Sequence, residues 1–353
     1  MEAIPEANPL NRSLLEDAWR LFCVYDRTAI VTQRRFLNFR IAILVVSVIS
    51  TMLVVVRAAW DKQLIALIGL DKPEFSQILV ILGNGFYGLV IIAPIAVSIL
   101  LAASIKLDRG MNWIVLRASA EVLKKEIYCY RTLGFNVQKE SDMRLAESIQ
   151  VVSDRLMKTQ VNRSGLALDR GLEIGSRDLL GTIKKNVSNK DSNPYSMLTV
   201  EQYLEYRLID QLSWYRRKTV KLDRQWQFLQ WSIYLWGGLG TFLAATRAEI
   251  WIAITNAIAT ALASFLDFKQ LDTTLMCYNQ AACNLENLLC WWHALTDEAR
   301  NERLNIEKLV LNTEKVIQSE TSSWVEEMRE ALSELYKDNE KSESQSSTKN
   351  IGN

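Results

Sequence analysis

The stretch IAILVVSVISTMLVVV, from Ile41 to Val56, contains no charged residue, no proline and no glycine. A helix rises about 1.5 Å per residue, so this run reaches roughly 24 Å, a little less than the ~30 Å hydrocarbon core of a bilayer. Phe39 and Trp60 extend it on either side, and Arg57 can turn its charged end outward to the headgroups. The sequence therefore predicts a membrane-spanning helix over residues 39–60.

Three further uncharged runs follow, and they predict spans over residues 76–105, 226–246 and 250–267; the last run is uncharged from Ile250 to Leu266. The first of these exceeds one span, which predicts a helix that tilts or kinks near Pro94. The last two are separated by only a few residues, so they are expected to pair as a tight antiparallel hairpin. Three tryptophans lie toward one end of the third run, as in an interfacial belt; these predicted interface anchors are Trp226, Trp231 and Trp236.

The distribution of Lys and Arg predicts which side of the membrane each connection occupies. The flanks before the first run, after the second and before the third carry five, five and six basic residues. The loop between the first two runs carries three, and the loop between the last two carries one. We therefore expect both termini and the central linker to lie in the cytoplasm.

The two halves of the chain also resemble each other. Aligned without gaps at an offset of 190 residues, aromatic and basic residues of one half meet similar residues of the other. The matched pairs are Tyr25 and Tyr215, Arg27 and Arg217, Arg34 and Arg224, and Phe36 and Trp226. Each half then continues into two apolar runs and a long helix, predicted over residues 111–134 and 275–295. Because the order is the same in both, this is a parallel repeat and not the inverted repeat common in transporters.

These patterns predict an all-α polytopic membrane protein with two tandem two-helix transmembrane hairpins and long cytoplasmic helices. The first module is expected over residues 1–163, a linker over 164–199, the second module over 200–338 and a disordered tail over 339–353. The polar stretch NVSNKDSNPYS within the linker is interpreted as a hinge. An amphipathic helix is predicted from Asp297 to Asp338.

Composition and motifs argue against several classes of function. With 41 basic and 40 acidic residues, the chain has no general nucleic-acid-binding charge. Its single histidine, His293, and its five cysteines show no metal-ligand spacing. No acidic or basic residue lies at mid-depth in the runs, which disfavours an ion-coupled transporter. We therefore expect no enzyme activity, no catalytic residue, no metal and no cofactor.

Small and polar residues inside the runs are the candidate helix-packing or pore-lining positions. The string GNGFYG in the second run matches a dinucleotide-binding pattern, but its place in an apolar segment favours close helix packing instead. A re-entrant loop lining a pore is the alternative for this segment. The candidate residues are Gly83, Asn84, Gly85, Gly88, Pro94, Gly237, Gly240, Asn256 and Thr260.

Two short stretches carry a family resemblance: LRASAEVLKKEIYCYRTLGF at residues 116–135 and SETSSWVEEMRE at residues 319–330. With the tandem pairs of apolar runs, they make the chain similar to the SLATT-like bacterial membrane proteins, which have two transmembrane helices. The resemblance implies a membrane effector of a stress or conflict system that forms pores or perturbs the membrane.

Two functions follow from the sequence as hypotheses. The first is an oligomeric pore-forming or membrane-perturbing effector in the bacterial inner membrane. The second is a non-catalytic membrane anchor or scaffold whose cytoplasmic helices bind a protein partner. The expected partners are the lipid bilayer, further copies of the chain and a cytoplasmic protein, with no nucleic acid.

Overall fold

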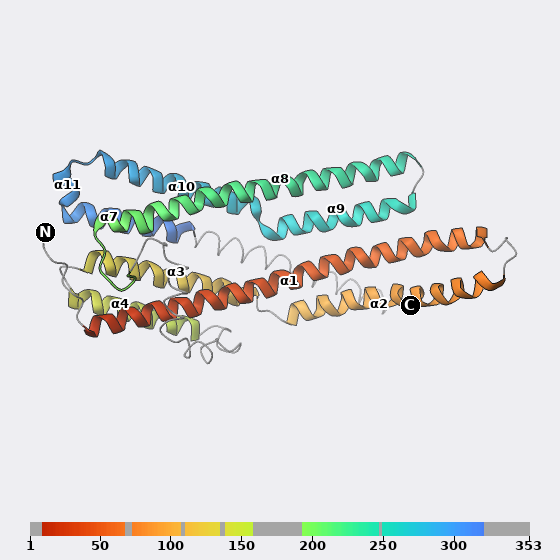
Figure 1. The fold of residues 1–353 in the computed structure, drawn as a ribbon, viewed down its shortest axis with the longest axis horizontal. Helices are drawn as coiled ribbons and strands as arrows, with labels where there is room; N and C mark the ends of the chain where they lie inside the picture. Colours follow the sequence, from red (N-terminus) through yellow and green to blue (C-terminus); the bar gives the residue numbers. More distant parts are fainter. Residues whose placement is uncertain are drawn as a thin grey trace, which may run out of the picture. The chain divides into compact units, whose positions relative to one another are not determined.

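The computed structural model describes residues 9–67, 73–106, 110–134, 138–157, 193–246 and 249–320. This part of the chain is 95% helical and contains no strand, which confirms the expected all-α class (Figure 1). The first half contributes α1 (Pro9–Leu67), α2 (Pro73–Lys106), α3 (Gly110–Leu133) and α4 (Gln138–Met157). The second half contributes α7 (Val200–Tyr203), η3 (Leu204–Ile209), α8 (Asp210–Ala245), α9 (Glu249–Lys269), α10 (Leu271–Ala294) and α11 (Asp297–Asn301). A last helix, residues 303–320, follows α11.

Helix bounds agree with expectation where the apolar pattern is strong. The helices expected at 111–134, 250–267 and 275–295 correspond to α3, α9 and α10. The amphipathic flanks before the first and third runs are continuous with those runs, so α1 and α8 are single helices of 59 and 36 residues. The backbone of α2 is helical through GNGFYG and past Pro94, which disagrees with a re-entrant loop there.

The helix predicted from Asp297 to Asp338 is broken near its start. Glu302 has extended backbone angles, with φ −70° and ψ 126°, and ends α11 after five residues. The Asn305 side chain then donates to the carbonyl of Ala299 across 2.9 Å and bridges the break. Residues 321–338 of this prediction and the predicted tail 339–353 lie outside the described residues.

Two helical stretches among the described residues are long and apolar enough to cross a membrane, Leu14–Ala58 and Trp251–Ala294. Only 11% and 17% of their most apolar windows are buried within the chain, unlike the core helices of soluble proteins. A shorter apolar helix covers Tyr87–Ala103. The run at 226–246, which is interrupted by polar and tryptophan residues, is not among these stretches.

The chain divides into two compact units, and each combines segments from both sequence halves. The first, here called the bundle unit, comprises Met1–Arg34, Arg109–Leu222 and Asp272–Ala331. The second, called the apolar unit, comprises Arg35–Asp108, Asp223–Leu271 and Leu332–Asn353. The predicted modules 1–163 and 200–338 are each shared between the two units.

The bundle unit has a hydrophobic core in which the two halves of the sequence meet. Trp19 packs edge-to-face on Tyr128, with ring centroids 6.2 Å apart, and Tyr128 packs in the same way on Tyr203 at 6.4 Å. Val310 from the last helix joins the same cluster. Residues that are more than 180 positions apart in the sequence therefore share one desolvated core, in which α3 and α4 pack together.

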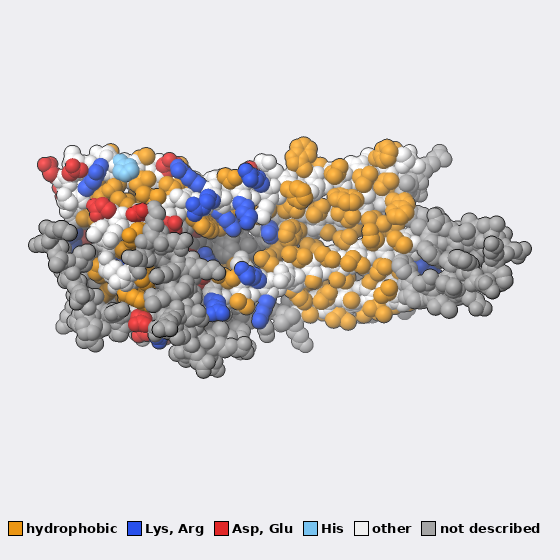
Figure 2. All heavy atoms as spheres, in the orientation of Figure 1, with side chains coloured by type: hydrophobic (Ala, Val, Ile, Leu, Met, Phe, Trp, Pro, Cys, Tyr) orange, Lys and Arg blue, Asp and Glu red, His pale blue; other side chains and the backbone are white. Residues whose placement is uncertain are grey.

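In the apolar unit, contacts within and between the two halves join the helices. Arg57 of α1 lies over the ring of Tyr87 in α2, with its guanidinium carbon 5.6 Å from the ring centroid. Phe36 of α1 packs against Phe268 of α9 with a centroid distance of 5.7 Å. Large apolar side chains cover the outside of these helices, where Figure 2 shows hydrophobic atoms gathered over a continuous surface.

Candidate functional site

A buried ion pair joins η3 to the last helix within the bundle unit. Nε of Arg207 donates to Oε1 of Glu314 at 2.8 Å, and Nη2 donates to Oε2 at 2.7 Å. The two side chains are 2% and 0% exposed. The planar guanidinium thus binds the carboxylate with two parallel hydrogen bonds, the strongest arrangement available to this pair.

Two tyrosines complete the surroundings of this pair. The hydroxyl of Tyr203 donates to Oε1 of Glu314 at 3.0 Å, and the guanidinium carbon of Arg207 lies 4.7 Å from the ring centroid of Tyr128. Burial alone would lower the pKa of Arg207, but the attraction of Glu314 raises it above its ordinary value. Burial and the charge of Glu314 raise the pKa of Tyr203 well above its ordinary value, so its phenol stays a neutral donor.

The segment that carries Arg207 has unusual backbone geometry. η3 is a π-helical turn from Leu204 to Ile209 between the short α7 and the long α8. π-turns insert one extra residue into a helical path and are frequent at functional sites. A capping box starts this segment: the Thr199 hydroxyl accepts from the amide of Gln202, and the Gln202 side chain accepts from the amide of Thr199. The helix entry is therefore fixed a few residues before the buried arginine.

A second charged cluster connects α1 with α3. Arg117 donates to Asp26 and also lies 3.1 Å from the carboxylate of Glu121. Burial raises the pKa of Asp26 despite the opposing charge of Arg117. Burial would also raise the pKa of Glu121, but Arg117 and Lys124 outweigh it and lower that pKa. The cluster is a charge-balanced network within the bundle unit.

Another buried cation, Arg131, holds the described end of the predicted linker. Arg131 is fully buried and donates to the carbonyls of Ser196 at 2.8 Å and Asn193 at 3.0 Å. The indole N–H of Trp19 donates to the carbonyl of Pro194 at 3.0 Å. Residues 193–198 are therefore tied to α1 and α3 and are not a free hinge, whereas residues 164–192 lie outside the described residues.

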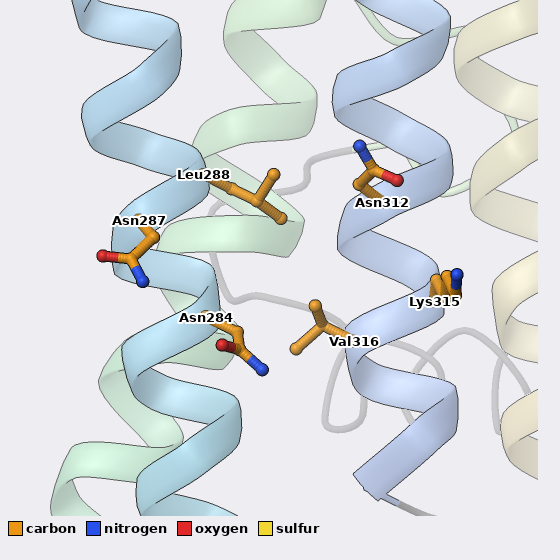
Figure 3. A pocket seen from close by; sticks show the side chains of 6 residues that line it. All are labelled: Asn284, Asn287, Leu288, Asn312, Lys315 and Val316. Carbon is orange, nitrogen blue, oxygen red and sulfur yellow. The ribbon is translucent and has the colours of Figure 1, made fainter.

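A shallow hollow of about 320 Å³ lies between α10 and the last helix. Figure 3 shows Leu288 and Val316 pointing into the space between the two helices, with asparagine side chains around them. The polar lining consists of Asn284, Asn287, Asn312 and Lys315. Amides and one ammonium group on an apolar floor can bind a polar peptide side chain, but the lining contains no nucleophile or acid–base pair.

The packing residues expected from the sequence have different surroundings. Gly240 lies close to α9: a Cβ at this position would be 3.0 Å from the hydroxyl of Thr255 and 3.3 Å from Oδ1 of Asn256. Gly88 and Gly237 face open space instead. Asn256 and Thr260 are both exposed on α9. The structure thus brings Gly240 and Asn256 together and adds Thr255, which the sequence did not single out.

The remaining predicted residues are described in part. Gly83, Asn84 and Gly85 are helical in α2, but their surroundings lie outside the described residues. Pro94 is exposed, and its carbonyl accepts from the Ser98 hydroxyl at 3.0 Å. Among the predicted interface anchors, Trp231 is 71% exposed and packs on Tyr234, while Trp226 and Trp236 are half-buried.

Sequence reasoning did not identify the buried ion pair, although one signal for it was present. Positions 310, 313, 314 and 317 follow the spacing of one helix face, and all four are buried. Glu314 therefore occupies a position that the pattern reserves for an apolar residue. A carboxylate at such a position requires a buried partner, but the sequence alone does not identify Arg207. Within the described residues, no group of three or more His, Cys, Asp or Glu side chains could hold a metal ion.

Comparison with known families gives one match. Residues 203–324 match the model of the SMODS and SLOG-associating 2TM effector domain 1. No curated protein and no solved structure matches the chain. The match runs from the turn that carries Arg207 past the helix that carries Glu314, so the ion pair joins the two ends of the matched region. This match and the two apolar helical stretches indicate a membrane location, and the second half of the chain carries a SLATT-like domain over residues 203–324.

Proposed function

We propose that the chain is an oligomeric membrane effector of a bacterial stress or conflict system, which acts by opening a pore or perturbing the membrane. Its four apolar runs cross the inner membrane, with both termini and the linker in the cytoplasm. The action requires no catalytic group. The observation that carries the proposal is the exposed apolar surface of the apolar unit, together with the effector family that residues 203–324 match.

The exposed surface is too apolar for a protein surrounded by water. Phe228, Trp231 and Leu235 of α8 are 72%, 71% and 71% exposed, and α2 exposes Ile92 and Ile99 to a similar extent. Contiguous apolar patches beyond a few hundred Å² are rare on soluble monomers and mark contacts with lipid or another chain. Helices with these exposed faces are stable in a bilayer, whose interior is as apolar as the side chains.

Equivalent contacts in the two halves support the tandem arrangement. Tyr25 of α1 contacts Ser153 of α4 at 3.4 Å, and its repeat partner Tyr215 donates to Glu320 of the last helix at 3.1 Å. At the next position, Asp26 of α1 pairs with Arg117 of α3. Its counterpart Arg216 of α8 pairs with Glu286 of α10 at 2.6 Å, so the charges are exchanged. The same helix positions therefore make corresponding contacts in both halves.

Small and polar residues on the outside of the apolar unit support association of several copies. Gly237 and Gly238 leave open space beside α8, and small residues allow close approach of membrane helices. Asn256 and Thr260, one turn apart on α9, expose polar groups on an apolar helix. A ring of copies would cover these positions or line a water path with them.

Release of a small dye from liposomes tests the proposal. The reconstituted chain is expected to release the dye with a dependence on protein density steeper than first order, and to have a mass above that of one chain in mild detergent. Asn256→Leu with Thr260→Val should reduce release at equal incorporation, while the exposed-surface change Ser319→Ala should leave it unchanged. Tight liposomes at high density with a single-chain mass would contradict the proposal.

A membrane anchor that binds a cytoplasmic protein is the second candidate, and the hollow lined by Asn284, Asn312 and Lys315 favours it. Deleting the last helix is a poor test, since it would also remove Glu314 and Val310 from the core. Asn284→Ala with Lys315→Ala changes the hollow alone. Loss of a co-purified partner with unchanged membrane insertion would support this function, and retention of the partner would argue against it.

A further inference from the structure

Each of the two long helices that enter the apolar unit carries a pair of exposed arginines seven residues apart. These are Arg27 and Arg34 on α1, and Arg217 and Arg224 on α8. Seven residues make nearly two helical turns, so the members of a pair lie on one face of their helix, about 10.5 Å apart along its axis. An aromatic residue follows each pair by two positions, Phe36 on α1 and Trp226 on α8.

The charged residues next to two of these arginines form ion pairs with other residues of the bundle unit. Asp26, next to Arg27, pairs with Arg117. Arg216, next to Arg217, pairs with Glu286 at 2.6 Å. Among the described residues, none of the four paired arginines forms an ion pair with an acidic side chain.

The basic excess on α8 extends beyond these arginines. Lys221 is exposed, and Lys218 lies half-buried one turn before it. Burial, followed by repulsion from Lys221 and Arg117, lowers the pKa of Lys218. Asp223, the acidic residue beside Arg224, accepts a hydrogen bond from the Gln227 side chain at 3.0 Å. Clustered cations on one segment of helix create a positive potential that attracts anions.

We propose that these two arginine pairs bind the headgroups of anionic phospholipids, with Arg34 and Arg224 on the phosphate and Arg27 and Arg217 toward the cytoplasmic side. The inference rests on the membrane insertion in the proposed function. With Phe36 and Trp226 at the interface, Arg34 and Arg224 lie about 3 Å outside it by the helical rise. Arg27 and Arg217 lie about 13.5 Å outside it by the same rise, and a side chain that turns toward the membrane shortens that distance.

The arrangement favours lipid over a soluble anion for a geometric reason. The two arginines of a pair are separated along the helix, which runs into the membrane, so a single small anion cannot bridge ~10.5 Å. A negatively charged surface attracts both members of a pair at once, since its potential extends over a Debye length of about 8–10 Å. Guanidinium groups also bind phosphate oxygens with two hydrogen bonds.

Lipid retention by the full chain tests the inference. The detergent-purified chain receives equal amounts of phosphatidylglycerol and phosphatidylcholine with the same acyl chains, and bound lipids are counted by native mass spectrometry. We expect phosphatidylglycerol to be retained roughly tenfold over phosphatidylcholine at low salt, and the preference to approach unity at 1 M salt. Added glycerol 3-phosphate should not displace the lipid.

The variant replaces the four arginines, Arg27, Arg34, Arg217 and Arg224, each with Gln, and should lose the preference. A control with the same change of charge replaces Arg144, Arg155, Arg303 and Lys308, which are exposed residues of the bundle unit outside α1 and α8, and should keep it. If the four-arginine variant does not insert into the membrane, the inference is judged on the unmodified chain alone, by whether 1 M salt abolishes its preference for phosphatidylglycerol. The inference would be overturned if the unmodified chain retained both lipids equally at low salt. It would also be overturned if the four-arginine variant and the control variant lost the phosphatidylglycerol preference to the same extent.

This outcome is separable from failure of the proposed function. Alkaline carbonate extraction of the unmodified chain from vesicles reports insertion directly. A chain that inserts but shows no lipid preference contradicts the arginine inference alone. A chain that is extracted as a soluble protein contradicts the membrane effector as well.

Discussion

At the residue scale, the energetics of the bundle unit depend on charges that have been removed from water. Transfer of one unpaired carboxylate or guanidinium into a protein interior costs several kcal/mol. Arg207 and Glu314 avoid most of this cost because each satisfies the other, with Tyr203 donating a third hydrogen bond. Their side chains are desolvated only when the last helix is docked, so the pair links the position of that helix to the integrity of the bundle.

Glu314→Gln should therefore destabilise the protein strongly. It leaves the Arg207 charge buried without its partner, for which an expected loss is about 3–5 kcal/mol of unfolding free energy. Glu307→Gln is the matched control, because the Arg303–Glu307 pair is exposed and an exposed pair contributes about 0–1 kcal/mol. Denaturant unfolding in detergent compares the two variants, and similar midpoints would argue against a buried functional pair.

Cysteine alkylation gives a second residue-scale prediction. Burial raises the pKa of Cys23 to about 12 and also raises that of Cys129, whereas Cys283 and Cys290 are exposed. Because only the thiolate reacts, a raised pKa lowers the reactive fraction at pH 8. We expect iodoacetamide to modify Cys283 and Cys290 in the native protein, and Cys23 and Cys129 only after unfolding. Mass spectrometry of the digested protein reads each site, and rapid native modification of Cys23 would contradict the core described for the bundle unit.

At the element scale, the apolar pattern predicted helices better than it predicted their interruptions. The bounds of α3, α9 and α10 follow from hydrophobic periodicity and run length. The break at Glu302 and the π-turn that carries Arg207 do not, because the break rests on side-chain and backbone hydrogen bonds around Ala299 and the π-turn carries a residue paired 107 positions away. The long polar stretch before Thr199 has the composition of a hinge, yet its described end is held by Arg131 and Trp19. Composition does not encode such long-range hydrogen bonds.

The contact of α8 with α9 leads to a prediction for two glycines that the sequence treated alike. A methyl group at Gly240 would press on the Thr255 hydroxyl at 3.0 Å, while one at Gly237 would meet no atom within 4 Å. Gly240→Ala should lower the midpoint of thermal unfolding, with an expected cost of about 1 kcal/mol. Gly237→Ala adds helix propensity where the methyl meets no atom, so it should not lower the unfolding midpoint of the single chain.

The same pair of variants separates packing within a chain from packing between chains. If Gly237 faces another copy, Gly237→Ala should shift the detergent-solubilised mass toward the single chain. Unfolding by differential scanning fluorimetry and native mass are measured on the same preparations. A larger loss of stability for Gly237→Ala than for Gly240→Ala would contradict the described contact of α8 with α9.

At the scale of the whole molecule, the compact units do not coincide with the two sequence halves. The core of the bundle unit joins Trp19 and Tyr128 of the first half with Tyr203 and Val310 of the second. Periodicity along each half could predict helices and a repeat, but it carries no information on whether the two halves pack into one shared core. The buried pair Arg207–Glu314 was missed as a unit for the same reason: its members are 107 positions apart.

The shared core predicts that neither half is stable alone. A fragment of residues 1–163 lacks Tyr203 and Val310, and a fragment of residues 200–338 lacks Trp19 and Tyr128. Each fragment should be digested rapidly by trypsin in its extramembrane part, and co-expression should restore resistance and co-purification. A protease-resistant fragment 1–163 on its own would show that the halves fold independently.

Membrane topology is the most direct test of the central claim, that four helices cross the bilayer with both termini on one side. Single-cysteine versions of the chain carry either native Cys283, Gln63→Cys or Thr246→Cys, and intact inside-out vesicles and spheroplasts are treated with a membrane-impermeant maleimide. The account predicts that Cys283 reacts in inside-out vesicles and that the cysteines at positions 63 and 246 react in spheroplasts. Reaction of position 63 or 246 from the same side as Cys283 would contradict it.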